Sequence, residues 1–216
     1  MTARQARAIT RIVPEALLWT VLVPALDVYD WLYLRYWRPQ PVGPVLYVDR
    51  RIYRGAARRF PDGTLLRPGD AIGELHLHNR RVRAIHATAG HPVPLGLTFR
   101  RLLVASLRAL AGAVEADPLL RPLEVFHAST ILATGAERIG FVVTAANGRA
   151  PFLRTLFFHL LLCRYHAHGL ARLPEHGLPP RELWLTTTEL RRRYGAVAAQ
   201  VGVTPGSVRA LPRGRP

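Results

Sequence analysis

The 216 residues are enough for one well-buried domain, and 49% of them are hydrophobic, which excludes a disordered chain. Thirty basic residues against fourteen acidic ones give a net charge of +16, and every basic residue is an arginine. Since the guanidinium group fits phosphates and carboxylates, the expected partners are polyanions: anionic lipid, acidic glycan or nucleic acid. The lone cysteine, Cys163, excludes an internal disulfide framework and is expected to be a buried thiol.

The most apolar and aromatic segment, residues 11–39, predicts a helix over about 14–37 that is ended by prolines. Its longest uncharged run, 16–26, has 11 residues, whereas a transmembrane helix needs roughly 20. A cleaved signal peptide is not expected, because Glu15 interrupts the apolar region. The helix either packs on the core or lies in a membrane interface, which its aromatic residues and flanking arginines suit. We therefore expect a protein that is cytoplasmic or peripheral at the cytoplasmic membrane.

The elements after this helix are predicted from alternating or amphipathic spacing and from turn residues. They are a strand at 45–55, a turn at 61–64, a strand at 73–79, an amphipathic helix at 95–115, a strand at 123–132, its antiparallel partner at 140–144, and a helix at about 151–166. A final segment, 183–195, begins extended and becomes helical at Thr187 or Thr188, either of which is a good N-cap.

Strands come in neighbouring pairs with helices between them, without a regular βαβ alternation. This order predicts an α+β fold with a mainly antiparallel sheet packed against several helices. We expect an N-terminal helical region at 1–40, one α+β domain at 41–200 and a basic tail at 201–216.

The segment "GELHLHN" carries Glu74, His76 and His78 two residues apart, so on a strand their side chains share a face. Two imidazoles at this spacing can hold one zinc-like divalent metal, which would activate water. The candidate ligands are His76, His78 and His127, with His166 or His168 as further third ligands and Asp70 or Glu74 as base. The alternative is that these groups only form hydrogen bonds in and beside the sheet. The candidate pocket residues are Asp70, Glu74, His76, His78, Asn79 and His127.

The sequence contains neither a nucleophile elbow nor a glycine-rich phosphate loop. Residues 196–211 have the spacing of a helix-turn-helix motif, although Pro205 and Gly206 would shorten its recognition helix. A packed helix followed by a basic tail is the other interpretation. DNA binding would use Arg191, Arg192, Arg193 and Arg209.

Residues 62–79, 123–143 and 156–173 resemble the YkoP-like domain family, which occurs attached to polysaccharide deacetylases and also alone. The closing "LWLTTTELRRRYG" is similar to the family's end, and the similarity spans about 30–195. The chain carries no deacetylase metal motif, so that activity is not transferred. The resemblance implies a cell-envelope setting, and its signature positions are Gly69, Asp70, Glu74, His76, Asn79, His127, Gly140 and Phe141.

The leading hypothesis is therefore a non-catalytic accessory or binding protein that meets cell-envelope polysaccharide or anionic lipid. A metal-dependent hydrolase that uses the His-x-His strand is the first alternative. A DNA-binding protein that uses the C-terminal segment is the second.

Overall fold

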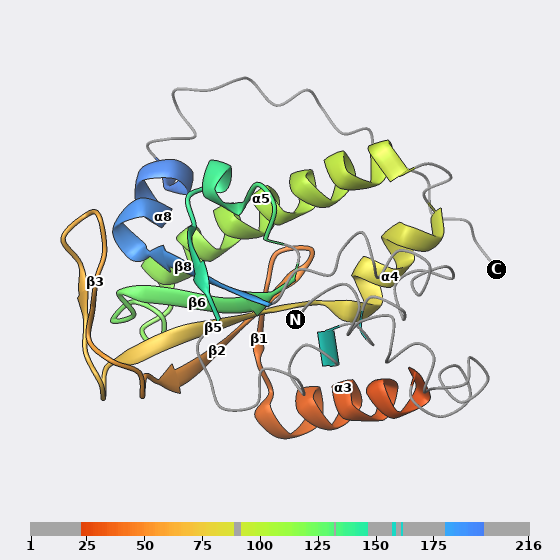
Figure 1. The fold of residues 1–216 in the computed structure, drawn as a ribbon, viewed down its shortest axis with the longest axis horizontal. Coiled ribbons are helices and arrows are strands. Elements are labelled where there is room, and N and C mark those ends of the chain that lie inside the picture. Colours follow the sequence, from red (N-terminus) through yellow and green to blue (C-terminus); the bar gives the residue numbers. More distant parts are fainter. Residues whose placement is uncertain are drawn as a thin grey trace.

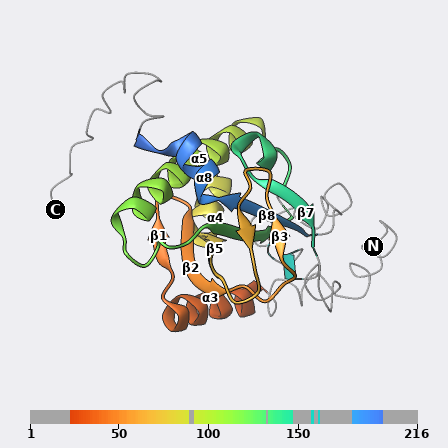
Figure 2. The same cartoon turned by 90° about the vertical axis from the view of Figure 1, so that its left-hand side faces the viewer.

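The computed structural model describes residues 23–88, 92–131, 133–146, 157, 158, 161 and 180–196. These residues form three layers (Figure 1): helix α3 (Val23–Trp37) lies on one face of a sheet, and helices α5 (Pro92–Ala116) and α8 (Thr187–Tyr194) lie on the other. Figure 2, which views the molecule from the side of strand β3 (Arg58–Arg59), shows the same layering. The predicted α+β fold with a mainly antiparallel sheet is confirmed.

The main sheet has six strands in the order β1-β2-β5-β6-β8-β7. Their bounds are Gln40–Val42 for β1, Leu46–Ile52 for β2, Ala71–Leu77 for β5, Val125–Thr130 for β6, Arg181–Thr186 for β8 and Val142–Ala145 for β7. Neighbouring strands are antiparallel except β5 and β6, which are parallel. The strands predicted at 45–55, 73–79, 123–132 and 140–144 are thus all present.

The predicted antiparallel pairing of 123–132 with 140–144 is wrong, because β8 lies between these strands and pairs with both. On β8, the side chains of Leu183, Trp184 and Leu185 are all buried, so this strand is covered on both of its faces. A strand of this kind belongs inside a sheet, whereas β7 is half-buried and takes the edge.

Parallel strands need a crossover connection, and here it contains α4 (Asn79–Thr88) and α5 (Pro92–Ala116). This βαβ unit was not predicted from the sequence. Its consequence is that the carboxyl ends of β5 and β6 point the same way. The amphipathic helix expected at 95–115 is confirmed as α5.

The core lies between α5 and the sheet. Leu107, Leu110 and Val114 of α5 are completely buried there against β-strand side chains that include Leu75 and Phe126. Burial of each such side chain contributes about 1.5–3 kcal/mol. The ring of Phe126 packs directly on β5, and this close contact requires a glycine at position 73.

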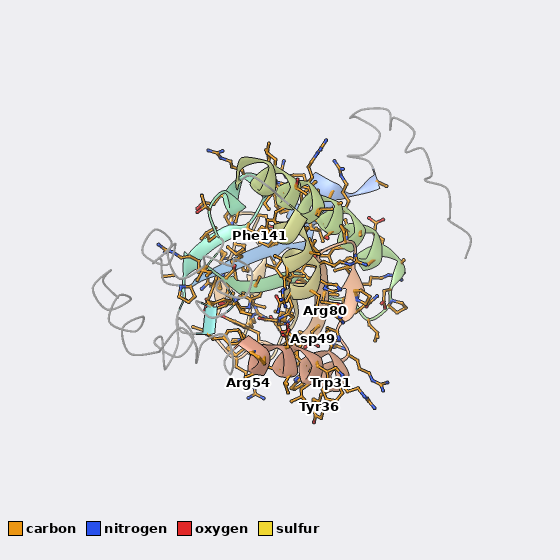
Figure 3. All side chains as sticks on the ribbon, turned by 90° about the vertical axis from the view of Figure 1, so that its right-hand side faces the viewer. Trp31, Tyr36, Asp49, Arg54, Arg80 and Phe141 are labelled. Carbon is orange, nitrogen blue, oxygen red and sulfur yellow. The ribbon has the colours of Figure 1, made fainter. Side chains whose placement is uncertain are left out.

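Helix α3 (Val23–Trp37) confirms the described part of the predicted N-terminal helix. Its large apolar side chains differ in exposure: Leu26 is buried, whereas Trp31 and Tyr36 are 63% and 78% exposed. Figure 3 shows the latter two side chains on α3. Among the helices of the described part of the chain, none has the length and apolar character that crossing a bilayer requires.

The chain becomes helical at Thr187, as predicted, and α8 runs over Thr187–Tyr194. The N-cap, however, is Thr186, one residue before the predicted candidates, because its Oγ1 atom accepts a hydrogen bond from the Glu189 amide at 3.2 Å. The same hydroxyl donates to Asp62 Oδ2 at 2.5 Å. Asp62 lies in the predicted turn at 61–64, which joins β3 (Arg58–Arg59) and β4 (Leu65–Leu66).

A short 3₁₀ helix, η2 (Ala136–Ile139), precedes β7 and ends at Gly140, whose φ angle is 97°. Residues 157, 158 and 161 are helical, within the helix predicted at 151–166. The rest of that prediction, with Cys163 and His166, lies outside the described residues, as does His168. So does the C-terminal segment from residue 197, with Arg209.

Candidate functional site

The sheet face beneath α3 carries a band of polar side chains. Alternate residues of a strand point to the same face, and the strand register places these residues side by side. Tyr47 is opposite His76, Asp49 is opposite Glu74, and Glu74 is opposite His127. We call the whole set the polar layer: Tyr47, Asp49, Arg51, Glu74, His76, His127, Ser129 and Glu182. Figure 3 places Asp49 between the sheet and α3.

Glu74 and His127 form the centre of this layer. The Oε2 atom of Glu74 lies 2.9 Å from Nδ1 of His127, and the two side chains are 22% and 14% exposed. The imidazole also packs on the indole of Trp184, with 4.2 Å between ring centroids. Its second nitrogen, Nε2, is buried and has no hydrogen-bond partner within the described residues. A histidine that is held through Nδ1 by a carboxylate presents Nε2 to a proton, a ligand or a metal.

His76 is the second imidazole of the layer, and its buried Nε2 atom also lacks a partner in the described part of the chain. Its ring lies 4.9 Å from the ring of Tyr33 on α3. Burial lowers the pKa of His76 below its usual 6.5, and the negative charges of Glu74 and Asp49 offset this only in part. His76 is therefore neutral at pH 7.

Tyr33 lies above the layer, and its buried hydroxyl makes no well-aligned hydrogen bond with the residues that the structure describes, although the Arg51 guanidinium is close enough to lower its pKa. Burial, followed by the charge of Asp49, raises the pKa of this phenol well above its usual value of 10.0. Neutral polar atoms that are buried without partners are costly unless a ligand or water completes them. Together with Nε2 of His76 and of His127, this hydroxyl marks the face as a candidate binding site.

Two cavities border the polar layer within the described residues, of about 740 Å³ and about 760 Å³. Tyr29, Tyr33, Glu74 and His76 line both of them, so the cavities meet at the polar layer. Both volumes fall within the range of small-molecule sites, roughly 300–1,000 Å³.

One cavity, of about 760 Å³, which we call the arginine cavity, is lined by three arginines, Arg51, Arg54 and Arg58, against two carboxylates. Aromatic rings hold two of these guanidinium groups. The Cζ atom of Arg51 lies 3.9 Å from the ring centre of Trp37, and that of Arg58 lies 4.6 Å from the ring centre of Trp184. Arg51 also lies 2.7 Å from Oδ2 of Asp49 in the polar layer. The cavity thus combines aromatic faces with an excess of positive charge.

The other cavity, which we call the apolar cavity, lies where β5 and β6 separate. These strands pair only at two positions, and their carboxyl-terminal halves diverge, which leaves room between them. Leucine and phenylalanine side chains of α5, β5 and the η2–β7 segment line its interior, among them Leu75, Leu103 and Phe141. Charged residues also line it: Arg80 and Arg83 of α4, and Asp27 and Asp30 of α3. Figure 3 shows Arg80 above Trp31 of α3.

The structure brings Glu74, His76 and His127 together, and it places the other predicted residues around them. His78 follows β5, stacks on Tyr47 with 4.9 Å between ring centroids, and lines the apolar cavity. Its pKa is lowered by burial and by the charge of Arg81. Asn79 donates to Asp30 of α3 at 2.9 Å and lines the same cavity.

Asp70 lies in the turn before β5, where its Oδ2 atom accepts a hydrogen bond from the Arg67 amide at 2.6 Å. The preceding Gly69 has a φ angle of 96°, which favours glycine. Asp70 lines neither cavity. The Gly-Asp signature therefore has a structural explanation, since it forms the turn that starts the site strand.

Among the described residues, no group of three or more histidine, cysteine, aspartate or glutamate side chains is placed to hold a metal ion. His166 and His168, the further ligand candidates, lie outside the described residues. Metal binding through His76, His78 and His127 remains a prediction. Glu74 and His127 nevertheless have the arrangement of a metal-binding histidine and its supporting carboxylate.

Of the arginines considered for nucleic acid, Arg191, Arg192 and Arg193 lie on α8, whereas Arg209 lies outside the described residues. Arg192 and Arg193 form ion pairs with Glu189. Arg192 donates to the Glu189 carboxylate at 2.7 Å, and Arg193 also donates to the carbonyl of Arg138 at 3.0 Å. Hydrogen bonds from Arg192, more than any other cause, hold the pKa of Glu189 at about 2. These contacts stabilise the end of α8 and the adjacent η2 helix.

Sequence reasoning missed Tyr33, Asp49 and the arginines of the cavity. The alternation Tyr47, Asp49, Arg51 along β2 was a usable signal, since it marks a second polar strand face beside "GELHLHN". No local signal could place Tyr33 or Trp184, because their contacts with the histidines depend on tertiary packing.

The fold and the site together define a small α+β domain that encloses ligand-sized cavities beside a buried carboxylate–histidine pair. The sequence model of the YkoP domain family matches residues 20–194, so the chain belongs to this family. The match begins earlier than the resemblance expected from the sequence, and it includes all of α3. Comparison with curated proteins and with solved structures found no match.

Proposed function

We propose that this YkoP domain protein is a non-catalytic binding protein that holds an anionic sugar of cell-envelope polysaccharide in its arginine cavity. The observation that supports this most is the lining of that cavity. Arg51, Arg54 and Arg58 face it together with the aromatic rings of Trp37, Tyr53 and Trp184.

Each group has a role in this proposal. Guanidinium groups bind a sugar carboxylate or phosphate through paired hydrogen bonds. The half-exposed Trp37 ring and the Tyr53 ring offer apolar surface to the C–H face of a sugar ring. Trp184, in contrast, is buried against Arg58 and His127 and supports the cavity wall. The unpartnered Nε2 atoms of His76 and His127 and the hydroxyl of Tyr33 are available for the sugar hydroxyls.

The same proposal places the protein against an anionic membrane surface, in the cytoplasm or at the periphery of the cytoplasmic membrane. Trp31, Leu32 and Tyr36 expose large apolar side chains on α3, which is the composition of an interfacial helix. The net charge of +16 would add attraction to anionic lipid.

The test is calorimetric titration with trigalacturonate, using neutral maltotriose as the comparison ligand. Arg58→Gln should weaken trigalacturonate binding at least about 10-fold, which corresponds to one charge-assisted hydrogen bond. Arg59→Gln is the matched control, because Arg59 is the next residue of β3 and does not line the cavity. Equal affinity for the two sugars, or equal losses in the two variants, would rule out the proposal.

A metal-dependent hydrolase is the second candidate. It is supported by the Glu74–His127 pair and by the unpartnered Nε2 atoms of His76 and His127. Elemental analysis of the purified protein, beside a His76→Ala/His78→Ala variant, tests it. About one zinc per chain that the variant loses would favour this candidate. A metal-free, folded protein would exclude it.

A further inference from the structure

The apolar cavity has no role in sugar binding as proposed above, yet it meets the arginine cavity at Tyr29, Tyr33, Glu74 and His76. A ligand that passes these four side chains would reach both cavities. Such a ligand needs a charged, hydroxyl-rich part and an apolar part. An aliphatic chain that carries an anionic sugar has this composition.

The interior of the apolar cavity suits an aliphatic chain. Its walls away from the polar layer come from Phe99 and Leu103 of α5, Leu77 of β5, and Phe158. About 740 Å³ of space remains between them. Unfilled apolar volume in a core is destabilising, because its lining loses dispersion contacts that a bound chain would restore.

The apolar cavity also reaches the exposed face of α3. Trp31 lines the cavity and is 63% exposed, and Val28 and Leu32 on the same helix are 56% and 51% exposed. Arg80 and Arg83 line the cavity near this helix, as do Asp27 and Asp30 of α3, and the two guanidinium groups can meet lipid phosphates. A chain could therefore enter from a bilayer along an apolar surface without first crossing water.

We propose that the two cavities bind one amphiphile, a lipid-linked anionic sugar, with its aliphatic chain in the apolar cavity and its head in the arginine cavity. The position of the head rests on the proposed function, whereas the position of the chain rests on the apolar cavity and on α3. Glu74, His76 and Tyr33 would then contact the junction of head and chain.

Three probes separate the two parts of the ligand. Dodecyl β-D-glucuronide carries both parts, methyl β-D-glucuronide carries the head, and dodecyl β-D-glucoside carries the chain on a neutral sugar. The two dodecyl compounds are titrated below their micellar concentrations, and binding of all three probes is measured by calorimetry and native mass spectrometry. Dodecyl glucuronide should bind at least about 100-fold more tightly than the methyl compound, which requires burial of about four methylene groups.

Leu103→Trp fills the apolar cavity and should weaken dodecyl glucuronide binding at least about 10-fold without changing the affinity for methyl glucuronide. Leu97→Trp is the matched control, because Leu97 lies on the same helix, is 59% exposed and does not line the cavity. Ala128→Leu fills the cavity from β6 and replaces Leu103→Trp if thermal unfolding shows that the latter is not folded.

Each outcome decides one part of the proposal. Equal affinities for the dodecyl and methyl glucuronides, or no loss in the filled variants, would disprove the position of the chain and leave sugar binding intact. Equal affinities for dodecyl glucuronide and dodecyl glucoside would disprove the position of the head. If trigalacturonate and all three probes fail to bind, the proposed function fails as well.

Discussion

Glu74 and His127 come from sequence positions 53 apart, yet their Oε2 and Nδ1 atoms lie 2.9 Å from each other across the parallel pair β5–β6. The contact fixes one imidazole nitrogen and leaves Nε2 buried without a partner within the described residues. It also lies where the two cavities come together, because Glu74 lines both. Any ligand that binds at the polar layer therefore meets this pair.

The first prediction concerns the tautomer of His127. Because the Glu74 carboxylate only accepts hydrogen bonds, neutral His127 should carry its proton on Nδ1. Nitrogen-15 NMR of the imidazole resolves the two tautomers. In Glu74→Ala the proton should shift toward Nε2, since the acceptor beside Nδ1 is removed. A wild-type imidazole protonated on Nε2 would contradict the arrangement.

The second prediction concerns stability against pH. Burial holds the pKa of His76 in the folded protein below the 6.5 of the unfolded chain. The contribution of neutral His76 to the free energy of unfolding is therefore complete above about pH 6.5. It is lost as pH falls toward the pKa of His76 in the folded protein, because only the unfolded chain then takes up the proton. The free energy of unfolding should fall by up to about 1.4 kcal/mol per pH unit in that range. Urea denaturation at several pH values measures it.

His76→Gln removes the titrating group, so the pH dependence of its unfolding free energy should be flatter than that of the wild type. His78→Gln is the comparison variant. The pKa of His78 is also lowered, but His78 follows β5 and is not part of the polar layer. Parallel curves for the wild type and His76→Gln would show that His76 is not the responsible group.

The third prediction concerns Gly73, the residue before Glu74. A Cβ atom here would lie 2.3 Å from Cδ1 of the completely buried Phe126 ring. Gly73→Ala should therefore lower the free energy of unfolding by about 1–3 kcal/mol through overpacking. Gly112→Ala is the control: nothing lies within 4 Å of its added Cβ, and in the α5 helix it should stabilise by about 0.5–1 kcal/mol. Equal effects of the two changes would contradict the close contact.

The fourth prediction concerns Thr186, which caps α8 and binds the turn residue Asp62. Thr186→Ala should lower the free energy of unfolding by about 1–2 kcal/mol, whereas the same change at the exposed Thr188 should have little effect. Burial raises the pKa of Asp62, but hydrogen bonds from Thr186 and Thr64 outweigh it and lower the pKa below 3.8. The difference between wild type and Thr186→Ala should therefore shrink as pH falls below about 3.8. If this difference in unfolding free energy does not change with pH, Thr186 stabilises the protein only as the N-cap of α8, without a contribution from its bond to Asp62.

The fifth prediction concerns α3 and membranes. The protein should co-sediment with vesicles that contain anionic lipid, and the bound fraction should fall as salt rises. Leu32→Ser should reduce binding several-fold, since Leu32 is 51% exposed on the aromatic helix. Leu119→Ser should not reduce vesicle binding, although Leu119, which follows α5, is 64% exposed. Failure to bind at low salt would exclude membrane contact.

Local spacing in the sequence determined several of these features. The alternation of Glu74 and His76 with leucines placed both polar side chains on one face of a strand, as β5 has them. The three- and four-residue apolar spacing at 95–115 identified α5. These features depend on the periods of strand and helix, which the order of residues carries by itself.

The neighbours of each strand were decided by the tertiary structure. β8 displaced β7 as the partner of β6, because Leu183, Trp184 and Leu185 all had to be buried. The parallel pairing that sets Glu74 beside His127 follows from the crossover through α4 and α5. Likewise, Arg54, Arg58 and Tyr33 reach one site only because α3 and the β3–β4 hairpin pack over the polar face. Spacing along the chain determines which side chains share a face, whereas burial of whole faces in long-range contacts determines which elements meet.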